Sequence, residues 1–147
     1  WWTTKNKLDG FIRENGYSSI RFLHNNSYCI EGTAICGTRG WSMPGESGFT
    51  DEDNKIYQRE LNRLELSLKS ANTAGGCIIA ALHFPPFNSQ GVFSDFFDIM
   101  LRYNVKICIY GHLHGAARKT AIEGNINGID LRLVAADHLG FKPARLL

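Results

Sequence analysis

The sequence predicts an α/β domain built around parallel strands. A continuous apolar run at 77–82 and a second run at 105–110, apolar except for Lys106, flank a segment over 92–103 whose aromatic residues recur at helical spacing. Such runs are typical of strands covered on both faces, and the order strand, helix, strand makes the two strands parallel with a right-handed crossover. The length of 147 residues, 44% of them hydrophobic, is enough for one domain with a sizeable core.

The first fifty residues predict one helix and three short strands. They divide into a helix over 3–15 that ends at Gly16, strands over 20–23, 27–31 and 33–37, and a glycine-rich loop over 38–50. Glu31 and Gly32 stand between the last two strands, and a two-residue connection of this kind indicates a hairpin.

The next segment, over 53–72, has the strongest helical pattern in the chain. Thr50 precedes it as a cap, and Asp53 places a negative charge in the first turn. On the polar side, Glu65 and Lys69 form a favourable pair one helical turn apart. Apolar side chains recur on one face at helical spacing, at Tyr57, Leu61, Leu64 and Leu68.

The second half of the chain completes the parallel unit and adds an antiparallel pair. Segments 117–123 and 128–135 predict two antiparallel strands joined around 125–127, and the tail from His138 has no regular pattern. The helix over 92–103 is expected to turn its apolar side inward, with Phe93, Phe96, Phe97, Met100 and Leu101.

Composition narrows the possible functions. The formal net charge is only +2 and no run of Lys and Arg forms a basic stripe, which argues against nucleic-acid binding. No apolar run approaches the ~20 residues of a membrane span. The first five residues lack the basic and apolar regions of a signal peptide. They also lack an initiator Met, so we expect the gene to begin further upstream.

Cysteine usage favours a reducing compartment. Cys29, Cys36, Cys77 and Cys108 each lie in an apolar, strand-like run, and no two of them have Cys-x-x-Cys spacing. Free cysteine is among the most buried residue types, so we expect four buried thiols, with disulfides as the alternative. Together with the missing signal-peptide pattern, this predicts a cytoplasmic protein.

Three histidines follow the two predicted parallel strands. His83 comes directly after the run at 77–82, and His112 and His114 follow the run at 105–110 between two glycines. The carboxyl ends of parallel strands meet at one edge of the sheet, where α/β proteins place ligands. Imidazole nitrogen is a common ligand of Zn, Mn, Fe and Ni. The spacing therefore predicts a metal site made of His83, His112 and His114.

The alternative is that these histidines have no common function. A single histidine after a strand is commonly a surface or core residue, and His24 and His138 are assigned no role for that reason. No phosphate loop, dinucleotide-binding turn or nucleophile elbow occurs in the chain. Arg39, in a glycine-bracketed loop after a strand, is a candidate contact for a substrate phosphate. The alternative there is a solvated Arg39 and a Trp41 that packs on the surface.

Two motifs resemble the calcineurin-like metallophosphoesterase superfamily. They are Leu-His-Phe-Pro-Pro at 82–86 and Gly-His-Leu-His-Gly at 111–115, and the stretches at 34–41 and 57–68 are similar to a bacterial branch of that superfamily. The resemblance implies a four-layer αββα sandwich with mixed sheets. It also implies that 1–147 is the C-terminal portion of a single such domain, because it covers only the second half of the family's pattern.

The resemblance further implies a hydrolase that uses two divalent ions, Mn, Fe or Zn, to cleave a phosphate ester. His83 and His112 would bind one ion and His114 the other. The remaining ligands and the proton donor belong to Asp-x-His, Gly-Asp and Gly-Asn-His-Asp motifs, none of which occurs in this chain. We therefore expect the missing N-terminal half to be this chain's partner. The chain alone should have little or no phosphatase activity, since losing positioned acid catalysis costs ~10²–10⁴ in rate.

Two further hypotheses remain open. The chain could be a non-catalytic fragment that binds metal or serves a structural purpose. It could also be a mononuclear three-histidine zinc hydrolase, which needs a general base, and Asp137 and Glu123 are the candidates. The residues do not identify the phosphate ester, and they do not distinguish Mn from Fe or Zn, since histidine accepts all three metals.

Overall fold

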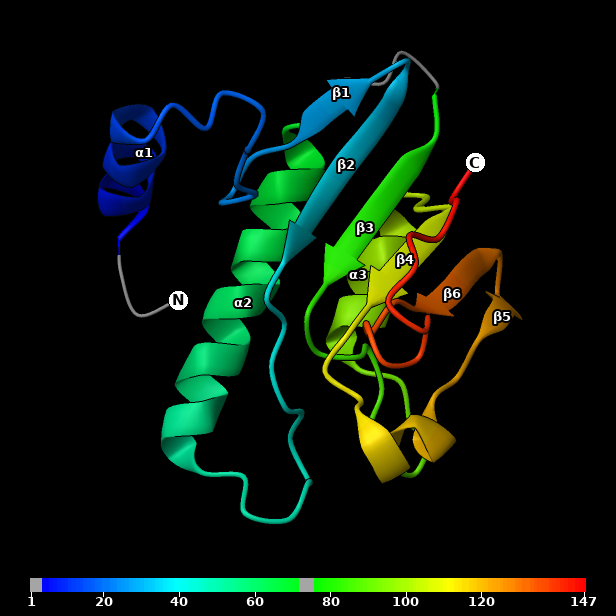
Figure 1. Cartoon of the computed structure of the whole chain (residues 1–147). Coiled ribbons are helices and arrows are strands. Elements are labelled where there is room, and N and C mark those ends of the chain that lie inside the picture. The colour runs from blue at the N-terminus through cyan, green and yellow to red at the C-terminus, as the bar shows by residue number, and fades with distance from the viewer. Residues whose placement is uncertain (1–3, 72–75) are drawn as a thin grey trace.

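In the computed structural model, which describes residues 4–71 and 76–147, the chain forms a six-stranded mixed sheet (Figure 1). The strands are β1 (Tyr28–Ile30), β2 (Thr33–Thr38), β3 (Ile78–Leu82), β4 (Ile107–Tyr110), β5 (Gly124–Ile126) and β6 (Ile129–Leu133), in the spatial order β1-β2-β3-β4-β6-β5. β2, β3, β4 and β6 are parallel, and β1 and β5 are antiparallel at the two edges. The α/β class and the parallel unit are confirmed.

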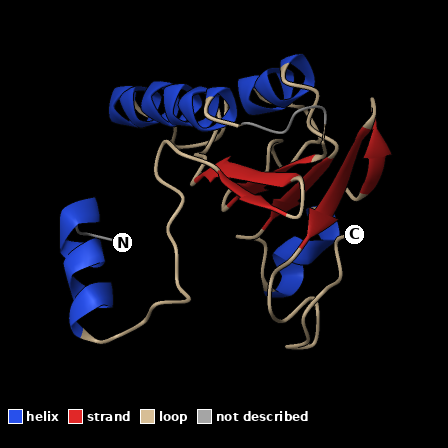
Figure 2. Ribbon diagram, turned by 90° about the horizontal axis from the view of Figure 1, so that it is seen from above, coloured by secondary structure: helices blue, strands red, loops and turns tan. Residues whose placement is uncertain are grey.

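The helices lie mainly on one side of this sheet. The described residues form α1 (Lys5–Glu14), α2 (Asp51–Lys69), α3 (Asp95–Arg102) and a 3₁₀ helix, η1 (Gly115–Thr120). Figure 2 shows α2 and α3 next to each other over one face, while α1 stands apart from the sheet. α1 buries no residue completely, so its docking depends on its partly buried side chains.

α2 forms as its sequence pattern predicts. The Thr50 hydroxyl accepts a hydrogen bond from the Asp53 amide, and the Asp53 carboxylate accepts one from the Thr50 amide, which makes a reciprocal capping box. Tyr57, Leu64 and Leu68 are buried against the sheet, and Leu61 is partly buried. α2 ends at Lys69 with Ser70 as its C-cap, so the predicted end at residue 72 is too late. The predicted start of the first helix, at residue 3, lies outside the described residues.

Both faces of the sheet are apolar. The face under α2 and α3 carries the main core, in which Cys36, Ala80, Cys108 and Leu131 are fully buried. Side chains alternate along a strand, so the residues between them point to the opposite face. That second face carries Ile35, Ile79, Ala81, Ile107 and Ile109, of which Ile79 and Ile107 are buried and adjacent in register.

Two hairpins close the edges of the sheet. Glu31 and Gly32 both have positive φ, 48° and 79°, and connect β1 to β2 as predicted. Asn127 and Gly128, with φ of 50° and 90°, make the same kind of turn between β5 and β6. A turn with two left-handed residues matches the natural twist of paired strands.

Two predicted strands are wrong. Residues 20–23 are irregular, because this segment bridges α1 and β1, and its Phe22 and Leu23 side chains line a cleft beside α1 instead of pairing in the sheet. The strand predicted over 117–123 is replaced by η1, since Ala, Arg and Lys at 116–119 are good helix formers. The antiparallel partner of β6 is the shorter β5, which begins at Gly124.

The four cysteines are free, as predicted. Cys36 and Cys108 are buried, and burial raises the pKa of each thiol, so both are inert as nucleophiles. The prediction of burial is wrong for Cys29, which is exposed on the edge strand β1, and Cys77 is half-buried. Among residues 4–71 and 76–147, no helix is both long and apolar enough to cross a bilayer.

Candidate functional site

The loops that follow β2, β3 and β4 meet at the carboxyl edge of the sheet. The backbone amides of His83 and Phe84 both donate to the carbonyl oxygen of Arg39, at 3.0 and 2.9 Å. The Gly111 amide in turn donates to the His83 carbonyl at 3.1 Å. These bonds extend the parallel pairing beyond the strands, so the first residues of the three loops have fixed positions relative to one another.

His83 and His112 are in direct contact at this edge. The Nε2 atom of His83 lies 3.2 Å from Nδ1 of His112, and the two rings are nearly perpendicular with centroids 5.1 Å apart. His112 has a backbone φ of 69°, in the left-handed region that residues other than glycine seldom adopt. Such backbone strain clusters at functional sites, where the surrounding structure enforces it.

A stack of side chains supports the His112 ring. Phe84 lies against it at 4.1 Å between centroids, and Trp41 packs on the other side of Phe84 at 5.2 Å. The Trp41 indole donates to a carboxylate oxygen of Asp53 at 3.0 Å, which ties the stack to the first turn of α2. Trp41 therefore packs within the molecule, between Phe84 and the first turn of α2.

The His114 ring makes its hydrogen bond with Asp137, not with the other two histidines. Its Nδ1 atom lies 2.8 Å from Oδ1 of Asp137, and the Gly115 amide donates to the other carboxylate oxygen at 3.0 Å. Arg118 donates to the Asp137 carbonyl at 2.9 Å. The Gly115 amide, followed by the His114 ring, lowers the pKa of Asp137 to about 2, so this carboxylate is ionised at neutral pH.

Sequence reasoning considered Asp137 only as a possible general base and missed its contact with His114. The one available signal was its position shortly after β6, which is parallel to β4 and ends at the same edge. Among the described residues, no group of three or more His, Cys, Asp or Glu side chains converges as a metal site. The structure thus brings His83 and His112 together and turns His114 to Asp137, and metal binding by all three stays a prediction.

Both contacting histidines favour the neutral, ligand-competent form. Partial burial, followed by the neighbouring rings of His112 and His114, lowers the pKa of His83. Partial burial and the His114 ring lower the pKa of His112 in the same way. Neutral imidazole is the form that binds a metal, so these shifts reduce competition from protons.

The lowered pKa values predict a loss of stability in acid. When a histidine pKa is lower in the folded than in the unfolded chain, the unfolded chain binds more protons as the pH falls below about 6.5. The free energy of unfolding of the metal-free chain should therefore decrease from pH 7 to pH 5. Chemical denaturation across this range measures it, and His83→Gln should flatten the profile. An identical pH profile for both proteins would contradict the prediction.

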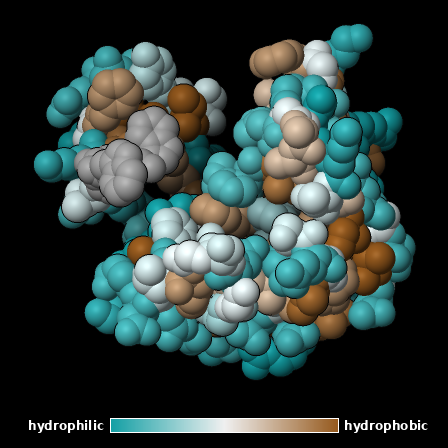
Figure 3. Space-filling view, turned by 90° about the horizontal axis from the view of Figure 1, so that it is seen from below, coloured by the Kyte–Doolittle hydropathy of each residue, from teal (hydrophilic) through white to brown (hydrophobic). Residues whose placement is uncertain are grey.

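Arg39 lies beside His83, at the mouth of a cleft. This cleft has a volume of about 780 Å³ and is bounded by α1, the segment 22–25, the end of β2 and one face of α2. In Figure 3 the molecule is hollowed between the part on the left, which contains α1, and the main body. The Arg39 guanidinium stacks on Trp41 at 4.2 Å and lies 3.5 Å from the buried Glu60 carboxylate, so it is neither simply solvated nor free to move.

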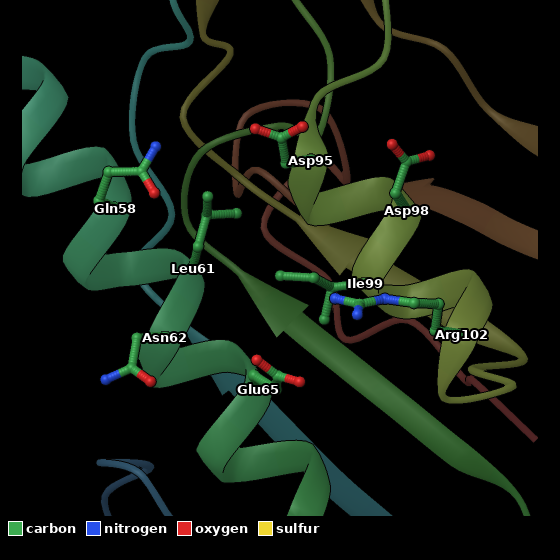
Figure 4. A pocket seen from close by; sticks show the side chains of 8 residues that line it. All are labelled: Gln58, Leu61, Asn62, Glu65, Asp95, Asp98, Ile99 and Arg102. Atoms are coloured by element: carbon green, nitrogen blue, oxygen red, sulfur yellow. The ribbon is translucent and has the colours of Figure 1, made fainter.

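A second hollow, of about 430 Å³, lies between α2 and α3 and contains none of the three histidines (Figure 4). Two of its three acidic side chains, Glu65 and Asp95, have partners within the fold. Glu65 accepts from the Tyr103 hydroxyl and pairs with Lys69, and Asp95 accepts from the Tyr57 hydroxyl. These contacts fasten α2 to α3 and to the rest of the core, so we assign this groove a structural role.

Comparison of the chain with protein-family models, with curated proteins and with solved structures gave no match. The metallophosphoesterase resemblance therefore rests on the sequence motifs alone.

Proposed function

We propose that this chain supplies the histidine half of a metal-dependent phosphoesterase site. The observation that carries the proposal is the contact between His83 Nε2 and His112 Nδ1, 3.2 Å apart at the carboxyl edge of two parallel strands. Two nitrogen atoms that bind the same zinc ion at 2.0–2.1 Å, in a tetrahedral arrangement, lie about 3.3 Å from each other. In this structure the 3.2 Å separation is a hydrogen bond between the two rings, and it is also compatible with two ligands of one ion.

His114 fits the second position in such a site. Metal-binding histidines commonly direct one ring nitrogen to a carboxylate, which fixes the ring and raises the basicity of the other nitrogen. Asp137 makes this contact with Nδ1 of His114, so Nε2 is the nitrogen available to a ligand. A rotation of the His114 ring toward the other two histidines, with Asp137 following, would complete the predicted set.

The proposed reaction needs positively charged groups that bind the phosphate and negatively charged groups that balance the metal ions. When bound, the divalent ions lower the pKa of a water molecule and stabilise the attacking and leaving oxygens of the phosphate. The three histidines contribute no negative charge to balance these ions. Arg39, next to His83, would bind a phosphate oxygen. The balancing carboxylates and the proton donor would come from the N-terminal half that the resemblance implies.

The second apolar face of the sheet supports the same proposal. Ile35, Ile79 and Ile107 form a row across three strands on the face opposite α2 and α3. In a four-layer αββα sandwich this face would pack against the second sheet, and the N-terminal half would provide that sheet. The row is lined by branched apolar residues, as the inner faces of stacked sheets are, although Ile79 and Ile107 are already buried in this chain and the row ends at Asp130 on β6.

The mononuclear alternative has less support. Asp137 already contacts His114 and the Gly115 amide. Glu123 accepts from the Leu133 amide at 3.1 Å and pairs with His138 at 3.4 Å. Both candidate general bases therefore have structural partners, and no other carboxylate among the described residues contacts the three histidines. The non-catalytic fragment hypothesis is decided by the experiment below.

The test is hydrolysis of an aryl phosphate diester with Mn²⁺, first by the 147-residue chain and then with the upstream segment of the gene restored. We expect little or no turnover by the chain alone and clear turnover by the longer protein. Robust turnover by the chain alone, abolished by His112→Asn, would establish the mononuclear alternative. An absence of turnover by the longer protein, whether or not it binds metal, would establish the non-catalytic alternative.

A further inference from the structure

The cleft beside His83 contains a cluster of arginines around one buried carboxylate. Glu60, on α2, is fully buried, with its side chain 0% exposed. One of its oxygens accepts from Arg63 at 2.8 Å and the other accepts from the Thr38 hydroxyl at 2.6 Å. Arg39 and Arg59 approach the first oxygen more loosely, at 3.5 and 3.8 Å.

The cluster has more positive charge than a structural ion pair needs. A buried carboxylate is neutralised by one guanidinium, and Arg63 makes the short contact that does this. Arg39 and Arg59 leave a surplus of two positive charges, whose mutual repulsion is a cost to the fold. Both are partly exposed, at 39% and 54% of their side-chain surface, so their remaining N–H donors are available to a ligand.

Glu60 has the geometry of a positioning residue. Arg59 and Arg63 are one helical turn apart and therefore lie on the same face of α2, and Arg39 reaches the carboxylate from the loop after β2. The buried Glu60 carboxylate therefore keeps the three guanidinium groups together at one side of the cleft. Planar guanidinium groups recognise phosphate by paired hydrogen bonds, and the three groups here come from two separate segments of the chain.

We infer that the cleft binds a second phosphate of the substrate, while the phosphate to be cleaved lies at the histidines. The cleavage of a phosphate ester in this inference rests on the proposed function. The second phosphate on the substrate is inferred from the arginine cluster. His83 and Arg39 both line the cleft, so the two anion positions share one opening. The volume of about 780 Å³ lies within the range of small-molecule sites. The substrate class is therefore a small phosphate ester that bears a further phosphate.

The first experiment measures binding of inorganic pyrophosphate to the metal-free chain by calorimetry, with inorganic phosphate as the comparison. We expect pyrophosphate to bind more tightly than phosphate and Arg59→Gln to weaken its binding by roughly tenfold or more, as for loss of a charge-assisted contact. Arg59 is suited to this test because its 3.8 Å contact with Glu60 is the loosest of the three. Arg13→Gln, on the exposed side of α1, removes the same charge and should leave binding unchanged.

Two outcomes would overturn the inference. One is equal affinity of Arg59→Gln and the unaltered chain for pyrophosphate. The other is an equal loss for Arg59→Gln and Arg13→Gln, which would indicate attraction by net charge alone. Metal binding is measured separately with Mn²⁺ on the same proteins, so a failed metal site and a failed anion site give different results. Arg59→Gln should bind Mn²⁺ normally, and His112→Asn should bind pyrophosphate normally.

Discussion

Replacing His112 by asparagine should reduce the affinity for a divalent metal by more than about a hundredfold. Changes to residues that only orient a ligand cost 10–100-fold, and this substitution removes a ligand itself. Asparagine is the suitable replacement because His112 has a φ of 69°, a conformation that asparagine adopts more readily than alanine. Calorimetric titration with Zn²⁺ or Mn²⁺ measures the change, and the melting temperature without metal shows that the fold is retained.

Two companion variants make this result specific. His138→Ala removes an imidazole that pairs with Glu123 away from the cluster and should leave metal affinity unchanged. Asp137→Asn keeps an acceptor for the Gly115 amide but removes the charge beside His114, and it should weaken binding by 10–100-fold. Metal affinity that is unaffected by His112→Asn would refute the assignment of this residue as a ligand.

The second large effect is expected at Gly37, inside β2. A Cβ atom at this position would lie 2.1 Å from the Ala81 carbonyl oxygen on β3, a distance that no packing adjustment of a side chain can relieve. Gly37→Ala should therefore force β2 away from β3 and lower the free energy of unfolding by at least about 2 kcal/mol. Because Arg39 follows two residues later, the same displacement should disturb its hydrogen bonds to the histidine loop.

Denaturation in urea measures this loss of stability. Gly10→Ala in α1 is the matched control, since its new Cβ would meet only the Glu14 carboxylate at 4.0 Å. That substitution should leave stability unchanged or raise it by up to about 1 kcal/mol, because alanine is the better helix former. A Gly37→Ala protein that unfolds at the same urea concentration as the unaltered chain would contradict the close approach of β2 and β3.

The local sequence pattern was sufficient to predict an element of secondary structure where that element depends on its own residues. The helix cap at Thr50, the apolar face of α2 and the hairpin at Glu31 and Gly32 depend on residues a few positions apart, and all three predictions are confirmed. The strands predicted from residue pattern at 20–23 and 117–123 do not form. The first segment is irregular, and much of the second belongs to the helix η1. The prediction that Cys29 is buried is also wrong. Its strand, β1, lies at the edge of the sheet, and the order of strands decides this position, not the residues of the strand.

The sequence by itself determined that His83 and His112 follow adjacent parallel strands, and therefore that they meet at one edge. Only the tertiary structure decided what each imidazole touches. Asp137 reaches His114 from 23 residues away, and Glu60 gathers arginines from α2 and from the loop after β2. Spacing along a chain determines which edge or face a residue occupies. The direction of a side chain depends on groups that distant segments bring within hydrogen-bonding distance, and no local pattern records them.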